Sequence, residues 1–155
     1  MKQIPEKPRN KSVIGVGALL YSVNTQRCMY LLRSQKQKNT WGLVGGKQNP
    51  GESVYDTLYR EINEEIGSMP DPHRLLPLET FTSDDDYFKF ITFICVVPDE
   101  FIPKLNHEHH GYCWIRLGEF PKPLHPGLWN TMNFDVIKQK IATLNKVKEW
   151  QFNPV

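Results

Sequence analysis

The sequence predicts a domain of mixed α/β (α+β) class. Several short apolar runs rich in β-branched residues are separated by turn-forming residues, which is typical of strands. Two longer segments instead repeat apolar residues at helical spacing. A length of 155 residues fits one domain with a single substantial core. We therefore expect residues 1–155 to form one domain, with a core over about 12–146 and a flexible N-terminal tail over 1–11.

The first part of the core predicts strands that lead to a glycine turn. Residues 12–23 are almost continuously apolar, which predicts a buried strand. After the turn-forming residues 24–27, residues 28–34 predict a second strand that returns beside the first. Residues 35–40 are polar and predict a loop, and WGLVGG at 41–46 predicts one short strand that ends in paired glycines.

The segment after the glycines has the clearest helical pattern. Ser53 and Asp56 have the spacing of a capping box, so the helix is expected to begin there. Apolar residues then recur at helical spacing as far as Ile66. Gly67 and Pro70 are typical signals for the end of a helix, so the helix is expected to stop at this point.

The second half predicts further strands and one more helix. Strands are expected over 74–83 and 87–97 on either side of an acidic turn at 84–86, and a later strand over 111–117. One helix is expected over 128–146, with its apolar residues at helical spacing at Met132, Val136, Ile137 and Ile141.

Composition limits the class of protein. Hydrophobic residues make up 39% and charged residues 23%, and a net charge of only +2 argues against a nucleic-acid binder with a strongly basic surface. No apolar run reaches the roughly 20 residues of a membrane span, and the polar start lacks the apolar centre of a secretion signal. We expect a cytoplasmic protein with no membrane or nucleic-acid partner, and a homodimer stays open. Buried, reduced thiols are expected at Cys28, Cys95 and Cys113.

Three glutamates crowd onto one side of the predicted helix. Glu61, Glu64 and Glu65 lie three or four residues apart and therefore repel one another. On a helical wheel Glu65 falls at the edge of the apolar arc, Glu61 just outside it and Glu64 farther round. A solvated acidic face would explain the cluster, and so would a divalent cation such as Mg²⁺, which takes oxygen ligands. Arg60 is spaced to tether a carboxylate of Glu52 or Glu61.

The preceding stretch GGKQNPGE, residues 45–52, favours the cation. Glycines let the backbone approach a ligand closely, and a glycine carbonyl can itself bind a metal. The stretch leads into a helix, whose first N–H groups attract anions. It is neither a P-loop nor a dinucleotide-binding fingerprint. Together with the acidic helix, this turn points to metal-assisted phosphate chemistry.

The glycine turn and the acidic helix together have a fixed spacing: Gly46, five residues, Glu52, seven residues and then REINEEIG at 60–67. This pattern resembles the Nudix box of the Nudix (MutT-like) hydrolases. All seven fixed letters of Gly-x5-Glu-x7-Arg-Glu-U-x-Glu-Glu-x-Gly-U are present, where U is a bulky aliphatic residue, and Ile62 fills the first U. A chance match at one position is on the order of 10⁻⁸ or less. Ser68 departs from the final U, where we expect local repacking and no loss of chemistry.

The likeness covers most of the chain and implies the Nudix fold, a mixed β-sheet sandwiched between helices (α/β/α). It also implies a pyrophosphohydrolase that splits a nucleoside diphosphate linked to another moiety, with Mg²⁺ as cofactor and Mn²⁺ as a substitute. Signatures of several substrate classes are missing, so nucleoside triphosphates and dinucleoside polyphosphates are the least disfavoured. The alternative is a nucleotide-sensing or interaction module, which usually lacks the box acids that this chain retains.

The resemblance also implies the metal site. Glu64 and Glu65 look like the core metal ligands, and Gly45 looks like the residue that lends its carbonyl. Glu61 looks like the general base or a further ligand. Glu108 is similar to the late acid that binds metal or acts as the base in some members, so the two glutamates compete for the base.

Other residues are candidates to orient the site or to bind substrate. Arg60 and Glu52 look like the charge pair that orients the helix. Arg33, at the end of a predicted strand, and Lys47, inside the glycine turn, are candidates to meet a phosphate, although surface basic residues need no such role. Tyr87 is a candidate substrate contact, with packing in the core as the alternative.

Two polar tracts remain. HEHH at 107–110 does not match the HExxH zinc pattern, and adjacent side chains on a strand point apart. We expect a loop that carries Glu108 rather than a zinc site. Asp84–Asp86 predicts a solvated hairpin turn, with a contact to the site as the alternative.

Overall fold

A computed structural model describes residues 12–34 and 39–152, so the expected tail 1–11 and most of the expected loop 35–40 lie outside the described residues. The described elements are strands β1 (Val13–Ser22), β2 (Arg27–Arg33), β3 (Trp41–Gly42), β4 (Val44–Lys47), β5 (Arg74–Thr82), β6 (Phe88–Val97) and β7 (His109–Arg116), and helices α1 (Val54–Ile66), α2 (Pro126–Met132) and α3 (Asp135–Leu144).

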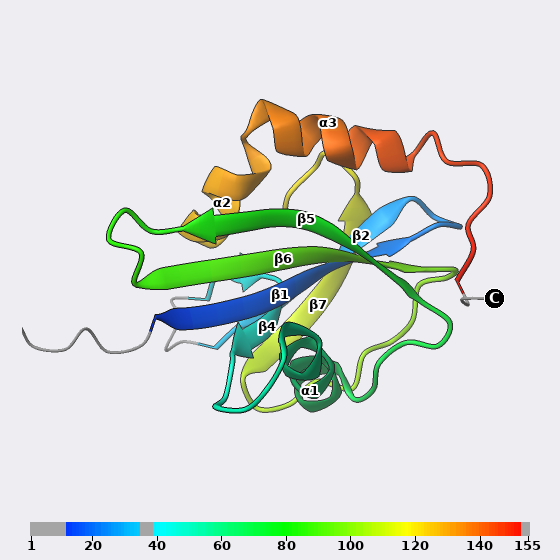
Figure 1. The fold of residues 1–155 in the computed structure, drawn as a ribbon. Coiled ribbons are helices and arrows are strands. Elements are labelled where there is room, and N and C mark those ends of the chain that lie inside the picture. Colours follow the sequence, from blue (N-terminus) through cyan, green and yellow to red (C-terminus); the bar gives the residue numbers. More distant parts are fainter. Residues whose placement is uncertain (1–11, 35–38, 153–155) are drawn as a thin grey trace, which may run out of the picture.

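The strands form a mixed sheet in the order β3-β2-β1-β6-β5, with β4 paired to β1 and β7 paired to β2. Strands β1 and β6 are parallel, and the other pairs of strands are antiparallel. Helix α1 covers one face of the sheet, and α2 and α3 cover the other (Figure 1). This arrangement confirms the expected sandwich of a mixed sheet between helices.

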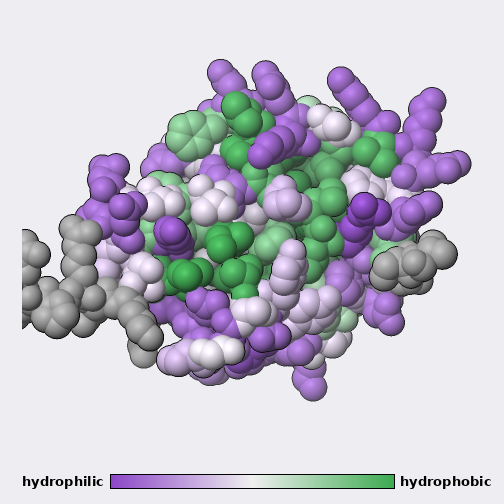
Figure 2. Space-filling view, in the orientation of Figure 1, coloured by the Kyte–Doolittle hydropathy of each residue, from purple (hydrophilic) through white to green (hydrophobic). Residues whose placement is uncertain are grey.

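Two hydrophobic cores lie on the two faces of the sheet because side chains alternate along a buried strand. On β1, Val16, Ala18 and Leu20 pack in the core under α1, whereas Leu19 and Tyr21 pack under α3. This explains why residues 12–23 read as one continuous apolar run. Along the face that β5 and β6 present, apolar side chains gather between hydrophilic ones (Figure 2).

Helix α1 forms where the sequence predicts it. Ser53 and Asp56 make both bonds of the capping box, and Gly67 ends the helix with a φ of 102°. Ser68 is exposed, and the next residue, Met69, packs against the core under α1. The apolar contact just past the helix is therefore made by Met69 and not by residue 68.

Two element predictions are wrong in detail. WGLVGG forms two strands, since β3 pairs with β2 and β4 pairs with β1. The expected helix over 128–146 is broken into α2 and α3. Asn133 bonds the carbonyl of Trp129 with its side-chain amide at 2.7 Å, and Phe134 adopts an extended backbone. Val136 consequently faces solvent and is 62% exposed, whereas Met132, Ile137 and Ile141 of the same pattern are buried.

Cys28 and Cys95 are buried free thiols as expected, whereas Cys113 is a free thiol that is only partly buried. None of the helices in residues 12–34 and 39–152 combines the length and hydropathy needed to cross a bilayer.

Candidate active site

Helix α1 carries the clustered glutamates from the core out to solvent. Glu65 is 3% exposed and Glu61 is 9% exposed, whereas Glu64 lies on the exposed side. The helical wheel predicts this order. Because water cannot stabilise the two buried carboxylates, a simple solvated acidic face does not describe Glu61 and Glu65.

Arg60 ties the acids to the glycine turn. Its guanidinium donates to both carboxylate oxygens of Glu52, at 2.7 and 3.0 Å, and to Glu61 Oε1 at 2.8 Å. It also donates to the backbone carbonyl of Lys47 at 2.9 Å and lies 3.4 Å from Glu64 Oε2. The bonds from Arg60 lower the pKa of Glu52 to about 2. The predicted charge pair is thus present, and it fixes the helix against β4.

The glycine turn lies directly against the buried acids. The N–H of Gly45 donates to Glu65 Oε2 at 2.7 Å. A Cβ added at Gly46 would lie 2.3 Å from Glu61 Oε1, so only glycine leaves room for that carboxylate. The two glycines therefore form the wall that Glu61 and Glu65 face.

Burial makes both acids hold their protons more tightly than usual. Burial raises the pKa of Glu65 to about 8. The hydrogen bond from Gly45 opposes this rise, and the charge of the nearby Glu61 adds to it. Burial also raises the pKa of Glu61, although its bond from Arg60 opposes the shift. A positive charge placed between such groups would favour their ionised forms.

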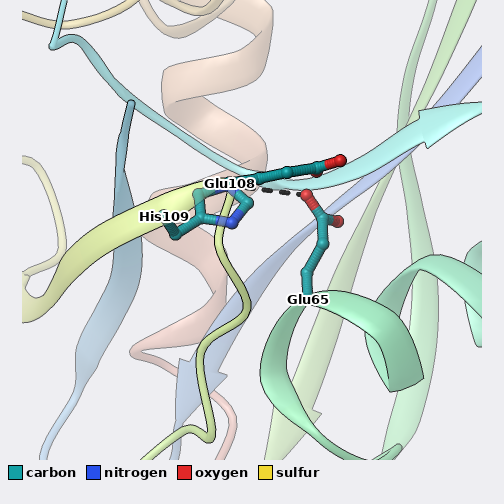
Figure 3. A group of neighbouring side chains, drawn as sticks. All are labelled: Glu65, Glu108 and His109. Carbon is teal, nitrogen blue, oxygen red and sulfur yellow. Dashed lines mark ion pairs between the residues drawn. The ribbon is translucent and has the colours of Figure 1, made fainter. Parts of the chain in front are cut away.

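Glu65, Glu108 and His109 meet at the start of β7 (Figure 3). Each offers one ligand atom, and these atoms all lie within 4.8 Å of one another. Within residues 12–34 and 39–152, this is the group whose geometry could hold a metal ion. Glu64 is not a member of the group, and its contact to Arg60 keeps it on the exposed flank.

The sequence pattern does not identify His109 as part of this group. Strand β7 begins at His109, two residues before the expected strand, so His107 and Glu108 stay in the loop. Leu32 pairs with Gly111, but Arg33 pairs with His109, so His110 is an extra residue in β7. This bulge places His109 beside Arg33 and leaves His110 exposed. The one available signal is the HEHH tract itself.

His109 and Glu65 do not form an ordinary ion pair. His109 Nε2 lies 3.5 Å from Glu65 Oε1, yet burial, with Arg33 nearby, lowers the pKa of His109 to about 4. An ion pair would raise the pKa of the histidine and lower that of the acid. Both shifts run the other way, so the metal-free pair is more stable uncharged.

The predicted substrate-binding residues lie in different places. Arg33 lies close enough to Glu65 and Glu108 to interact electrostatically with both carboxylates. Its guanidinium lies 3.5 Å from the carbonyl oxygen of Leu43. Lys47 is exposed at the end of β4.

Tyr87 lies apart from this cluster. Its carbonyl accepts from Val13, about 13 Å along β1 from Gly17, the residue that pairs with Gly45. The neighbouring Asp84–Asp86 forms the expected hairpin turn, in which Asp85 accepts from the N–H of Tyr87.

The NUDIX domain family model matches residues 11–133, which is well over half of the chain. The chain belongs to the NUDIX family. Known structures with this fold include the MutT protein from Methanosarcina mazei Go1, at 25% identity and a TM-score of 0.63, where the match covers 91% of this chain and all of that one. The MutT NUDIX hydrolase from Burkholderia pseudomallei matches at 22% identity and a TM-score of 0.60, over 79% of this chain and 97% of the other.

Curated relatives of this NUDIX chain match over shorter segments. Nucleoside triphosphatase NudI from Escherichia coli O17:K52:H18 is 32% identical over 88 residues, which cover 49% of this chain and 61% of NudI. The mouse nucleoside diphosphate-linked moiety X motif 6 protein is 34% identical over 65 residues, which cover 42% of this chain and 21% of that protein. The chain thus spans less than two thirds of these relatives.

The metal-free NUDIX chain is expected to lose stability as pH rises from 6.5 to 8. With a pKa of about 8, Glu65 binds its proton in the folded state at pH values where the unfolded chain has released it. The unfolding free energy therefore falls through this window, by about 2 kcal/mol. The pKa of His109 is lowered from its ordinary value of 6.5 to about 4, so this residue makes the unfolding free energy rise with pH. That effect is confined to pH values below 6.5 and does not enter the window.

Urea unfolding in EDTA at pH 6.5 and 8 measures this loss. Glu65→Gln should flatten the pH dependence, and an equally steep fall in that variant would contradict the assignment to Glu65.

Proposed function

We propose that this chain hydrolyses nucleoside triphosphates, and more generally nucleoside diphosphates linked to another moiety, at a pyrophosphate bond. The observation that carries the proposal is the pair of buried carboxylates, Glu61 and Glu65, held against a glycine turn with an arginine tether. Matches to nucleoside triphosphatase NudI relatives at about 31% identity favour the triphosphate class over dinucleoside polyphosphates.

The residues of the site fit a divalent cation, for which we propose Mg²⁺ with Mn²⁺ as a substitute. Two buried acids whose pKa values are raised lie side by side, and a cation would relieve both. Glu65 and Glu108 would hold it, with Glu64 and the carbonyl of Gly45 as further oxygen ligands, and Glu61 would be a ligand only where Glu108 is the base. Such an ion neutralises phosphate charge and makes a bound water more acidic.

The remaining chemistry belongs to the side chains of the chain. We assign the general base to Glu61, because burial moves its pKa toward the working pH, with Glu108 as the competing candidate. Arg60 holds Glu61 in place through its 2.8 Å bond. Lys47 is assigned to the substrate phosphates because it is exposed within the glycine turn, and Arg33 because it interacts with the charges of Glu65 and Glu108.

A substrate panel with Mg²⁺ or Mn²⁺ tests this function. Nucleoside triphosphates, dinucleoside polyphosphates and sugar nucleotides are incubated with the full chain, and released phosphate and pyrophosphate are measured separately. Release of pyrophosphate from triphosphates, absent in EDTA, is the expected result. Tight binding of a nucleotide without turnover of any panel member would instead support a sensing module.

Gly46→Ala is expected to lower hydrolysis by about 10²-fold while leaving the fold intact. The added Cβ collides with the carboxylate of Glu61, which is the far end of a flexible side chain and can swing aside. The general base would then be misplaced, and an error of this size costs about two orders of magnitude. Steady-state kinetics and thermal unfolding measured together test it. A large loss of stability, or full activity, would contradict this role for Gly46.

A further inference from the structure

His109 brings a ring nitrogen into a group that otherwise consists of carboxylates. The residue is 7% exposed, and its Nε2 lies 3.5 Å from Glu65 Oε1. This separation is at the outer limit for a hydrogen bond between nitrogen and oxygen. Two ligands that bind one small divalent ion at about 2.1 Å and at right angles lie roughly 3 Å apart. The spacing is therefore close to that of two neighbouring metal ligands.

The other ring nitrogen of His109 is held by Asn106. The amide oxygen of Asn106 accepts from the N–H of Glu108 at 3.1 Å and lies 3.3 Å from His109 Nδ1. Because an amide oxygen can only accept, Nδ1 carries the hydrogen, and a neutral ring has its lone pair on Nε2. A metal-binding histidine usually donates its second N–H to an oxygen in this way, which fixes the ring.

We propose that His109 Nε2 binds the same divalent cation as Glu65 and Glu108, and that this nitrogen raises the affinity of the site for transition-metal ions such as Co²⁺ more than its affinity for Mg²⁺. The proposal rests on the proposed function, which places a cation at Glu65. Imidazole binds first-row ions with an affinity that rises from Mn²⁺ to Co²⁺ and Ni²⁺, whereas Mg²⁺ favours oxygen. The bulge in β7 puts His109, rather than His110, opposite Arg33 and next to Glu65.

Pulsed electron paramagnetic resonance of the Mn²⁺-loaded full chain tests for the nitrogen directly. The wild-type protein should show modulation from a coordinated ¹⁴N nucleus. His109→Gln should lose the modulation, whereas His110→Gln, an exposed neighbour in the same strand, should keep it. Bound Mn²⁺ without ¹⁴N modulation in the wild type overturns the proposal, and this measurement does not depend on whether a variant folds.

Calorimetric titrations with Co²⁺ and Mg²⁺ test the preference. His109→Gln should lower the affinity for Co²⁺ by at least about 10-fold and that for Mg²⁺ by less than about threefold. Equal losses for the two ions overturn the claim on metal preference. If neither ion binds and the substrate panel shows no metal-dependent turnover, the proposed function fails as well. Turnover without the nitrogen signal removes only the role of His109.

Discussion

Glu65→Gln is expected to lower kcat for nucleotide hydrolysis by at least about 10³-fold, or about 4 kcal/mol of transition-state stabilisation. The substitution keeps the size of the side chain, and its amide oxygen can still accept the hydrogen bond from Gly45. It removes the negative charge that a cation requires at this buried position. Initial rates at saturating Mg²⁺, with the substrate that the panel identifies, measure the effect.

Two comparisons make the result on Glu65 specific. Glu119→Gln changes an exposed glutamate in a loop outside the site and should leave kcat unchanged. Glu64→Gln tests the second ligand that the family pattern implies, although Glu64 is exposed and contacts Arg60. Wild-type rates in both Glu64→Gln and Glu65→Gln would show that the metal assignment on α1 is wrong.

Gly45→Ala is expected to destabilise the metal-free fold by about 3 kcal/mol or more. A Cβ at this position would lie 2.3 Å from the carbonyl oxygen of Val16 and 2.6 Å from the Cα of Gly17. Both atoms belong to the backbone of the central strand β1 and cannot swing away. The φ of 155° adds strain for any residue with a side chain. Urea unfolding in EDTA measures the change.

Gly51→Ala is the matched control for Gly45→Ala. Gly51 has a φ of 83° but nothing within 4 Å of an added Cβ. Only the backbone strain then remains, which costs roughly 1–2 kcal/mol. Equal losses of stability in the two variants would show that the close approach of β4 to β1 does not determine the requirement for glycine at 45.

Local patterns were sufficient to predict helix α1 and the buried strands. The capping box, the stop at Gly67 and the order of burial of the glutamates all depend on residues within a few turns of one another. The broken helix after Met132 was missed because its cause is a side-chain bond by Asn133, which periodicity does not register. Likewise, WGLVGG divides into two strands because its halves pair with different neighbours.

By itself the sequence determined which acids and glycines this protein has and that they share one helix and one turn, because their spacing follows from helical geometry. Only the tertiary structure decided which groups meet. Regular pairing of β7 with β2 would have placed His110 opposite Arg33, but the bulge puts His109 there, next to Glu65. Pairing between distant strands sets that register, and no local pattern near residue 109 contains this information.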